Sequence, residues 1–236
     1  MPNSYFRFKQ FTIQQDRCSM KVCTDSCILG AWTASRLKRS LRVLDIGAGT
    51  GLLTLMLAQK NQCRFDAIEL DRPTFEQAAE NIRDSPWADR IGLFQGDVRN
   101  YPFLHSYDFI ISNPPFFESG LPSPFPEINK ARRAESLPPE ELISVIRRLL
   151  NAGGAFSLLL PFYRTAYVEK LAAEKGFFLQ EKLLMRQTPA HGPFRSALLF
   201  SDSKPISAAV QELALRSGNG VETDELLALL QDYYLR

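Results

Sequence analysis

The chain has 236 residues, 45% of them hydrophobic and 23% charged, which is typical of one large globular domain with a sizeable core. No apolar run is long enough to span a bilayer and no signal-peptide pattern is visible, so we expect a cytoplasmic protein with no membrane partner. The net charge of +2 permits a nucleic-acid partner without requiring one. With only two histidines, the sequence argues against a hydrolase built on a histidine base and against a metal site. Cys18, Cys23 and Cys27 lack CxxC spacing and are interpreted as reduced thiols.

After about forty residues, short apolar runs alternate with helical ones, which predicts a doubly wound α/β domain with a mostly parallel sheet. The expected strands are Leu41–Ile46, Phe65–Leu70, Ile91–Gln95, Tyr107–Ser112, Ala155–Leu160, Leu179–Met185 and Ala197–Phe200. The expected helices are Leu52–Lys60, Pro73–Asp84, Pro139–Leu150, Arg164–Lys175 and Thr223–Tyr234. Gly153–Gly154 is expected to end the third helix. Phe117–Pro138 breaks the alternation as a long, proline-rich loop, and such loops are usually functional or disordered.

A glycine-rich loop, Asp45-Ile46-Gly47-Ala48-Gly49-Thr50-Gly51, follows the first expected strand. Glycine is needed where the backbone turns sharply and approaches a ligand, and the helix that follows offers its N-terminus to polar ligand groups. The loop is not a P-loop, because no Gly-Lys-Ser/Thr follows it. It is also a poor dinucleotide fingerprint, because Leu52 occupies the position of the third glycine.

Two carboxylates follow the next two strands. Glu69 is placed to accept hydrogen bonds from ribose hydroxyls, and Asp97, in Gly96-Asp97-Val98, to accept one from an adenine edge. The ordered set of Asp45, the glycines, Glu69 and Asp97 resembles the S-adenosylmethionine methyltransferase superfamily. The resemblance implies a Rossmann-like class I fold, with seven strands of which the last is antiparallel, and S-adenosylmethionine as the cofactor. The expected cofactor-binding residues in this region are Asp45, Gly47, Ala48, Gly49, Gly51, Glu69, Leu70, Asp97, Val98 and Asn113.

The fourth strand runs into Asn113-Pro114-Pro115-Phe116, which we expect to be the catalytic turn. An exocyclic amine is a weak nucleophile because its lone pair is delocalised into the ring. The Asn113 side-chain oxygen and the Pro114 carbonyl can each accept one N–H of the amine, which directs its lone pair at a methyl donor. Phe116 can stack on the ring, and the two prolines stiffen the turn. The motif therefore predicts methylation of an amino nitrogen.

Several segments together resemble the bacterial tRNA1(Val) adenine-37 N6-methyltransferases, with a likeness that fades after about residue 160. They are Phe8–Phe11, Asp16–Asp25, Leu29–Trp32, Leu44–Leu53, Ser85–Ala88, Ile110–Phe116 and Ala131–Arg132. The resemblance implies N6-methylation of adenine 37 in the anticodon loop of tRNA1(Val). It also implies that Lys21, Thr24 and Asp25 lie beside the cofactor. Cys23, Cys27 and Phe116 depart from the family's usual residues.

We expect residues 1–40 to form an N-terminal extension that packs on the cofactor site, and 41–236 to form the methyltransferase domain. The expected tRNA contacts are Lys9, Arg17, Lys130, Arg132, Arg133, Arg186 and Arg195. Three alternatives stay open. They are a ribosomal RNA guanine N2-methyltransferase, a protein glutamine N5-methyltransferase, which usually has a larger N-terminal domain, and a non-catalytic RNA-binding factor that keeps the fold. A monomer is favoured.

Overall fold

The computed structural model describes residues 3–18, 20–37, 41–114 and 137–235. Most of the long proline-rich loop expected from the sequence therefore lies outside the described residues. Within the described ranges, no helix is long and apolar enough to cross a membrane.

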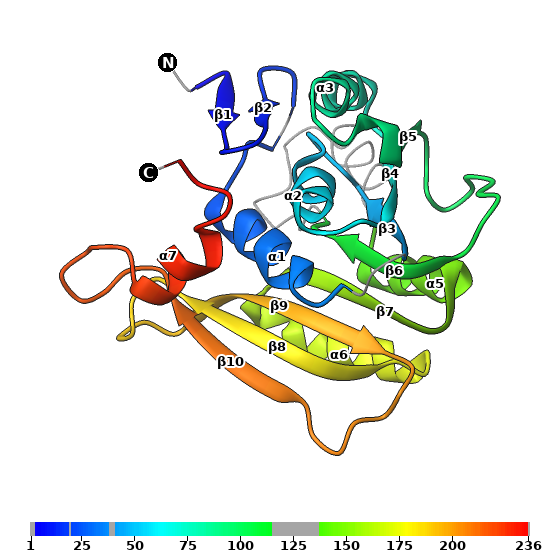
Figure 1. Ribbon diagram of the computed structural model, residues 1–236. Helices are drawn as coiled ribbons and strands as arrows, with labels where there is room; N and C mark the ends of the chain where they lie inside the picture. The colour runs from blue at the N-terminus through cyan, green and yellow to red at the C-terminus, as the bar shows by residue number, and fades with distance from the viewer. Residues whose placement is uncertain (1–2, 19, 38–40, 115–136, 236) are drawn as a thin grey trace, which may run out of the picture.

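One sheet of eight strands organises the fold, in the order β10-β8-β9-β7-β6-β3-β4-β5 (Figure 1). The strands are β3 (Arg42–Ile46), β4 (Arg64–Glu69), β5 (Ile91–Gln95), β6 (Tyr107–Ser112), β7 (Leu150–Pro161), β8 (Phe178–Arg186), β9 (Pro193–Ser201) and β10 (Ala209–Ala214). Strands β3 to β7 are mutually parallel, whereas β9 runs antiparallel to both of its neighbours, β7 and β8. The mostly parallel sheet, whose seventh strand β9 is antiparallel, is confirmed.

The eighth strand, β10, was not expected from the sequence. It pairs in parallel with β8 at the edge of the sheet, and Leu213 is its only buried residue. An edge strand with so little buried surface carries neither the apolar run nor the alternation that identifies a strand in a sequence.

The expectation that Gly153–Gly154 would end a helix is wrong. Helix α5 (Pro139–Leu149) ends where Leu150 becomes extended, and both glycines lie inside β7. A Cβ on Gly154 would stand 2.8 Å from the Leu150 side chain, and Gly153 has φ +76°. The register of β6 against β7 also shifts between Tyr107 and Phe109. The glycines accommodate this irregularity in the strand.

Helices cover both faces of the sheet. Alternate residues of a strand face opposite sides, so Phe109 and Ile110 of β6 belong to different cores. The first core includes α1 (Thr24–Ala34), α2 (Leu52–Lys60) and α7 (Asp224–Leu230); the second includes α5 and α6 (Thr165–Glu174). Helix α3 (Arg72–Arg83) packs against β5, and short 3-10 helices span Ala88–Arg90 and Phe162–Arg164.

The N-terminal residues form a hairpin of β1 (Tyr5–Arg7) and β2 (Thr12–Gln14), followed by α1. Phe8 and Ile13 are buried, and an isolated bridge joins Phe8 to Tyr234, so the two ends of the chain lie close together (Figure 1). Strand β2 contacts α3, the helix that follows β4. The hairpin is therefore part of the core and is attached directly to the helix beside the glycine-rich loop.

Candidate active site

The carboxyl ends of β3, β4, β5 and β6 converge on one cleft of about 890 Å³, a volume that includes the solvent at its mouth. Ligands of open parallel sheets bind at this edge, because the loops that leave the strands diverge there. The expected site residues that line the cleft are Gly47, Gly49, Glu69, Leu70, Asp97, Val98, Asn113 and Pro114. One residue from each of four successive strand ends thus reaches the same cavity.

The glycine-rich loop has the backbone that only glycine adopts readily. Gly47 has φ +71° and Gly49 has φ +57°, and a Cβ on either would meet no atom within 4 Å. The loop is fixed by its neighbours: the Gly47 amide donates to the Ile68 carbonyl at 3.0 Å, and the Gly49 amide donates to Glu69 Oε2 at 2.9 Å. The result is an open, rigid backbone surface along one wall of the cleft.

The two expected carboxylates are engaged in different ways. Glu69 also accepts the Asp71 amide on Oε1 at 2.9 Å, so each of its oxygens holds one backbone donor and keeps capacity for another. Asp97 is paired with Arg99, whose Nε lies 2.8 Å from Oδ2. The hydrogen bonds from Arg99 hold the pKa of Asp97 below its ordinary value. Asp97 is therefore an anion whose accepting capacity is shared between Arg99 and the cleft.

Asp45 does not line the cleft. It is buried, and its Oδ2 accepts from the amide and the hydroxyl of Thr54, at 3.2 and 2.7 Å, in the first turn of α2. Among the residues that the structure describes, none forms a hydrogen bond with its Oδ1. Burial, with a further contribution from the negative charge of Glu69, raises the pKa of Asp45 to about 7. Asp45 thus supports the start of α2 behind the loop, rather than presenting a carboxylate to a ligand.

The turn expected to be catalytic begins at the end of β6. Ser112 is fully buried and donates to the Ile46 carbonyl at 2.7 Å, which ties this turn to the glycine-rich loop. The Asn113 side-chain nitrogen donates to Ser26 Oγ at 2.8 Å and lies 3.8 Å from Met20 Sδ. None of the hydrogen bonds within the described part of the chain uses Asn113 Oδ1. Pro115 and Phe116, the other expected members of the turn, lie outside the described residues.

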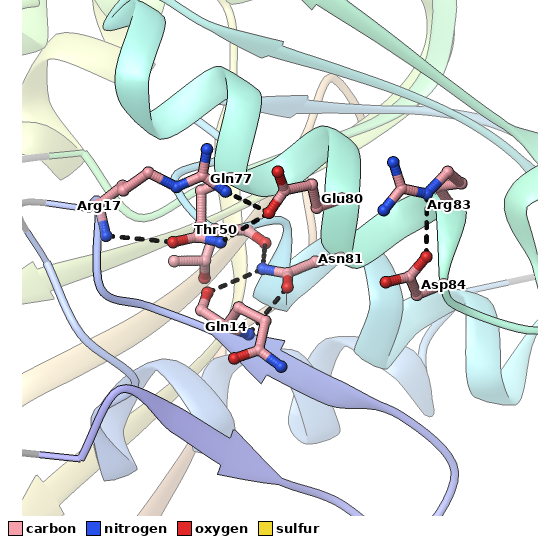
Figure 2. A network of polar contacts seen from close by, with 8 residues as sticks. All are labelled: Gln14, Arg17, Thr50, Gln77, Glu80, Asn81, Arg83 and Asp84. Carbon is pink, nitrogen blue, oxygen red and sulfur yellow. Dashed lines mark hydrogen bonds and ion pairs between the residues drawn. The ribbon is translucent and has the colours of Figure 1, made fainter.

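A polar network joins the N-terminal segment to the site (Figure 2). Asn81 of α3 accepts the Gln14 amide at 2.8 Å, donates to the Gln14 carbonyl at 3.0 Å, and donates to the Thr50 carbonyl at 2.9 Å. The Arg17 amide donates to Gln77 Oε1 at 3.1 Å. Asn81 and Gln77 are buried, so one face of α3 fixes both the hairpin and the glycine-rich loop.

Six expected cofactor residues are not brought to the cleft wall: Lys21, Thr24, Asp25, Asp45, Ala48 and Gly51. Lys21 Nζ donates to the Asn3 carbonyl at 3.3 Å. Thr24 and Asp25 line a separate pocket between the start of α1, the β8–β9 connection and α7, and Asp25 is paired with Arg195 at 3.0 Å. Gly51 caps α2 with φ +81°. Of the six, Asp45 and Gly51 support the start of α2.

The expected tRNA contacts are dispersed, and the described arginines among them are already paired. Arg17 pairs with Glu80, Arg186 with Glu212 at 2.7 Å, and Arg195 with Asp25. Lys9 donates to the Gln231 carbonyl at 2.5 Å. Lys130, Arg132 and Arg133 lie outside the described residues. A paired arginine can neutralise a phosphate only if it first releases its carboxylate. The three paired arginines are therefore less suited to bind tRNA phosphates than unpaired ones would be.

Sequence reasoning missed several residues of the site. Met20, Arg99 and Leu137 line the cleft, and Ser26 contacts Asn113. Arg99 stands two residues after Asp97, and this short spacing could have predicted that Arg99 also lies at the cleft. Met20 and Ser26 precede Asn113 by 93 and 87 residues, and no local pattern relates such positions.

The cleft suits an adenosine derivative. Ile46, Ile68, Val98 and Leu137 supply apolar walls for a flat ring, and Glu69 and Asp97 supply acceptors for hydroxyl and amino donors. The open glycine backbone lets a ligand approach closely. The residues present therefore fit S-adenosylmethionine.

Comparisons with known proteins identify the family and the fold. Residues 31–159 match the family model described as "Methyltransferase small domain". The chain is 43% identical to a protein of Dyadobacter fermentans, covering 99% of this chain and 98% of the relative, and 41% identical to one of Tolumonas auensis, covering 98% and 97%. Both relatives are named tRNA1(Val) (adenine(37)-N6)-methyltransferase. A crystal structure of a predicted O-methyltransferase from Agrobacterium tumefaciens covers 88% of this chain and 96% of its own, with a TM-score of 0.67 at 18% identity. That last likeness shows the shared class I methyltransferase fold.

Proposed function

This chain belongs to the tRNA1(Val) (adenine(37)-N6)-methyltransferase family, an enzyme family that uses S-adenosylmethionine, and from that membership we propose that it methylates N6 of adenine 37 in tRNA1(Val). The observation that carries the proposal is the position of Asn113. It lies at the end of β6, lines the adenosine-sized cleft, and has its side-chain nitrogen held by Ser26. Its oxygen is the group left for a substrate N–H.

The residues proposed to hold the cofactor are those of the cleft wall. Glu69 accepts from the ribose hydroxyls, Asp97 with its Arg99 partner faces the adenine edge, and the open backbone of Gly47 and Gly49 allows close approach. When bound, S-adenosylmethionine supplies an electrophilic methyl group on a positively charged sulfur. The ion pair between Arg99 and Asp97 keeps that carboxylate ionised over the pH range in which the enzyme is expected to work.

The proposed chemistry at the turn is positioning. Asn113 Oδ1 and the Pro114 carbonyl each accept one N–H of the substrate amine, which moves the nitrogen toward tetrahedral geometry and frees its lone pair. S-adenosylmethionine would supply the methyl carbon for the bond that this nitrogen forms, and its sulfur would keep the electrons of the carbon–sulfur bond. The surplus proton leaves to water from a nitrogen whose acidity the new bond has raised. The attack of the amine on the methyl group needs no general base with a shifted pKa. Phe116 is proposed to stack on the ring.

An adenine in an anticodon loop is stacked on its neighbours, so it must be turned out to reach Asn113. One base fills a pocket of this kind, and choice among tRNAs then requires contacts farther away. Because Arg17, Arg186 and Arg195 are each paired with a carboxylate, we propose Lys9, Lys130, Arg132 and Arg133 as the phosphate contacts. A tRNA substrate places the proposed activity in the cytoplasm.

The direct test is nucleoside mass spectrometry of unmodified tRNA after incubation with the purified protein and labelled S-adenosylmethionine. The expected product is N6-methyladenosine in tRNA1(Val). This product should be absent when adenine 37 of the tRNA is replaced by guanine. Methylation of a glutamine peptide or of ribosomal RNA guanine, with every tRNA adenine unmodified, would contradict the proposal.

A further inference from the structure

The side-chain amide of Asn113 can lie in two orientations, related by a half-turn about the bond to its carbonyl carbon. With Oδ1 toward the cleft, the residue accepts an N–H from the substrate amine; with the nitrogen toward the cleft, it opposes that N–H with its own donors. The rate of the proposed reaction therefore depends on which orientation the protein selects. The turn around Asn113 does not by itself favour one orientation of the amide, because the two orientations differ little in shape.

The group that fixes the orientation of the Asn113 amide lies on another element, helix α1. Ser26, in the first turn of α1, is buried, and its Oγ lies 2.8 Å from Asn113 Nδ2. The same Oγ lies 2.9 Å from Cys23 Sγ. Ser26 thus bridges Asn113 and Cys23.

Which atom donates in each of these hydrogen bonds follows from Asp25, the residue that lies beyond Cys23 in this series of contacts. Asp25 is paired with Arg195 at 3.0 Å and, as a carboxylate, can only accept. Burial, followed by the negative charge of Asp25, raises the pKa of Cys23 to about 11, so this residue is a neutral thiol whose S–H is attracted toward that carboxylate. The Cys23 sulfur is then left as an acceptor for the Ser26 hydroxyl. The Ser26 oxygen in turn is left as an acceptor for Asn113 Nδ2.

We propose that Ser26 is a positioning residue, which holds Asn113 with its oxygen toward the substrate amine. Ser26 is the last member of a polar relay that starts at Arg195 and continues through Asp25 and Cys23. This inference rests on the proposed role of Asn113. Ser26 touches neither the cleft nor the reacting atoms; it acts through Asn113. The Asp25–Arg195 pair, which sequence reasoning assigned to cofactor and RNA contacts, is the anchor of the relay.

The test is a double-mutant cycle on methylation of an unmodified tRNA1(Val) transcript, with turnover and cofactor affinity measured separately. Loss of one neutral hydrogen bond predicts that Ser26→Ala lowers kcat about fivefold to tenfold, with unchanged affinity for S-adenosylmethionine by calorimetry. In an Asn113→Ala background, measured in single turnovers, Ser26→Ala should have no further effect, because there is no amide left to orient. Ser26→Thr, which keeps the hydroxyl, should restore turnover.

Two further variants keep the test informative if the Ser26 variants fold poorly. Cys23→Ser preserves a group that can donate to Asp25 and accept from Ser26, and should turn over like the wild type. Cys23→Ala removes the acceptor, lets the Ser26 hydroxyl rotate, and should lower kcat. Ser35→Ala is the matched control, since Ser35 lies at the other end of α1 and donates to the Trp32 carbonyl at 2.9 Å.

The outcomes separate this inference from the proposed function. If Asn113→Ala turns over normally, the assignment of Asn113 is wrong and the positioning role falls with it. If Asn113→Ala is impaired but Ser26→Ala and Cys23→Ala are both normal, Asn113 stands and the relay is overturned. An equal loss from Ser26→Ala in the wild-type and Asn113→Ala backgrounds also overturns it, because the effect would then be structural.

Discussion

Glu69 accepts the backbone amide of Gly49 at 2.9 Å while it lines the cleft, so one carboxylate both shapes the glycine-rich loop and faces the cavity. Because its other oxygen holds the Asp71 amide, no neutral side chain of the same size can replace it. A glutamine would present its NH₂ group to one of these two amides.

We therefore predict that Glu69→Gln weakens S-adenosylmethionine binding by about 1–3 kcal/mol, as expected for loss of a charge-assisted hydrogen bond. Isothermal titration calorimetry measures this directly. Glu76→Gln is the control, because Glu76 is exposed on α3 and pairs with Arg72 within its own helix. Equal affinity in the two variants would show that Glu69 does not contact the cofactor.

Asn113→Ala should lower kcat about a hundredfold or more, because it removes an acceptor that acts in the transition state. Affinity for the cofactor should remain nearly that of the wild type, since the cleft wall is intact. Steady-state methylation and calorimetry together separate the two effects. Asn219→Ala, in an exposed turn, is the control, and a normal rate in Asn113→Ala would rule out the mechanism.

The raised pKa of Asp45 predicts a pH-dependent stability. Its pKa is about 7 in the folded chain against 3.8 for an aspartate in water, so the folded state binds the proton more tightly. The stabilisation that comes from the protonated form is complete below pH 3.8 and is lost as pH rises through 7. Asp45→Asn keeps an acceptor for Thr54 and never ionises.

The free energy of unfolding of Asp45→Asn, relative to the wild type, should therefore increase between pH 5 and pH 8 by a few kcal/mol. Urea denaturation at several pH values, with no cofactor present, measures the difference and cancels the titration of all other groups. A difference that stays constant over this range would mean that Asp45 is ionised throughout.

Asn81→Ala removes three hydrogen bonds to backbone groups, of which the one to the Thr50 carbonyl is buried, so we predict a loss of about 1–3 kcal/mol of stability. Because one of them is to the Thr50 carbonyl, cofactor affinity should fall as well. Arg83→Ala is a matched control on the same helix, since Arg83 is exposed and its pair with Asp84 stands apart from the network (Figure 2). Urea denaturation and hydrogen exchange at residues 12–17 measure the effect. An Asn81→Ala variant that is as stable as the wild type and keeps residues 12–17 protected would show that the hairpin does not depend on α3.

Arg132→Ala with Arg133→Ala should weaken tRNA binding and reduce the slope of log affinity against log salt by about two, one for each phosphate contact. Cofactor affinity should not change. Arg186→Ala should alter the slope much less, because Glu212 already neutralises Arg186. Filter binding at several salt concentrations distinguishes the two variants. Equal slopes in both would mean that the loop residues do not reach the phosphates.

The sequence by itself determined the parts of this protein that depend on local backbone chemistry and strand order. Glycines at positions 47 and 49 predicted a loop with left-handed backbone, and both have positive φ. Because parallel strands end at one edge, the positions of Glu69, Asp97 and Asn113 after three strands were enough to predict that they meet.

Only the tertiary structure decided which groups hold those residues in place. Ser26 and Asn113 are 87 residues apart, and Asn81 joins β2 to the glycine-rich loop across 67 and 31 residues. Asp45 looked like a ligand residue, but its side chain faces Thr54. A hydrogen bond between distant segments leaves no periodic trace in a sequence, because it depends on how whole elements pack and not on the residues beside it.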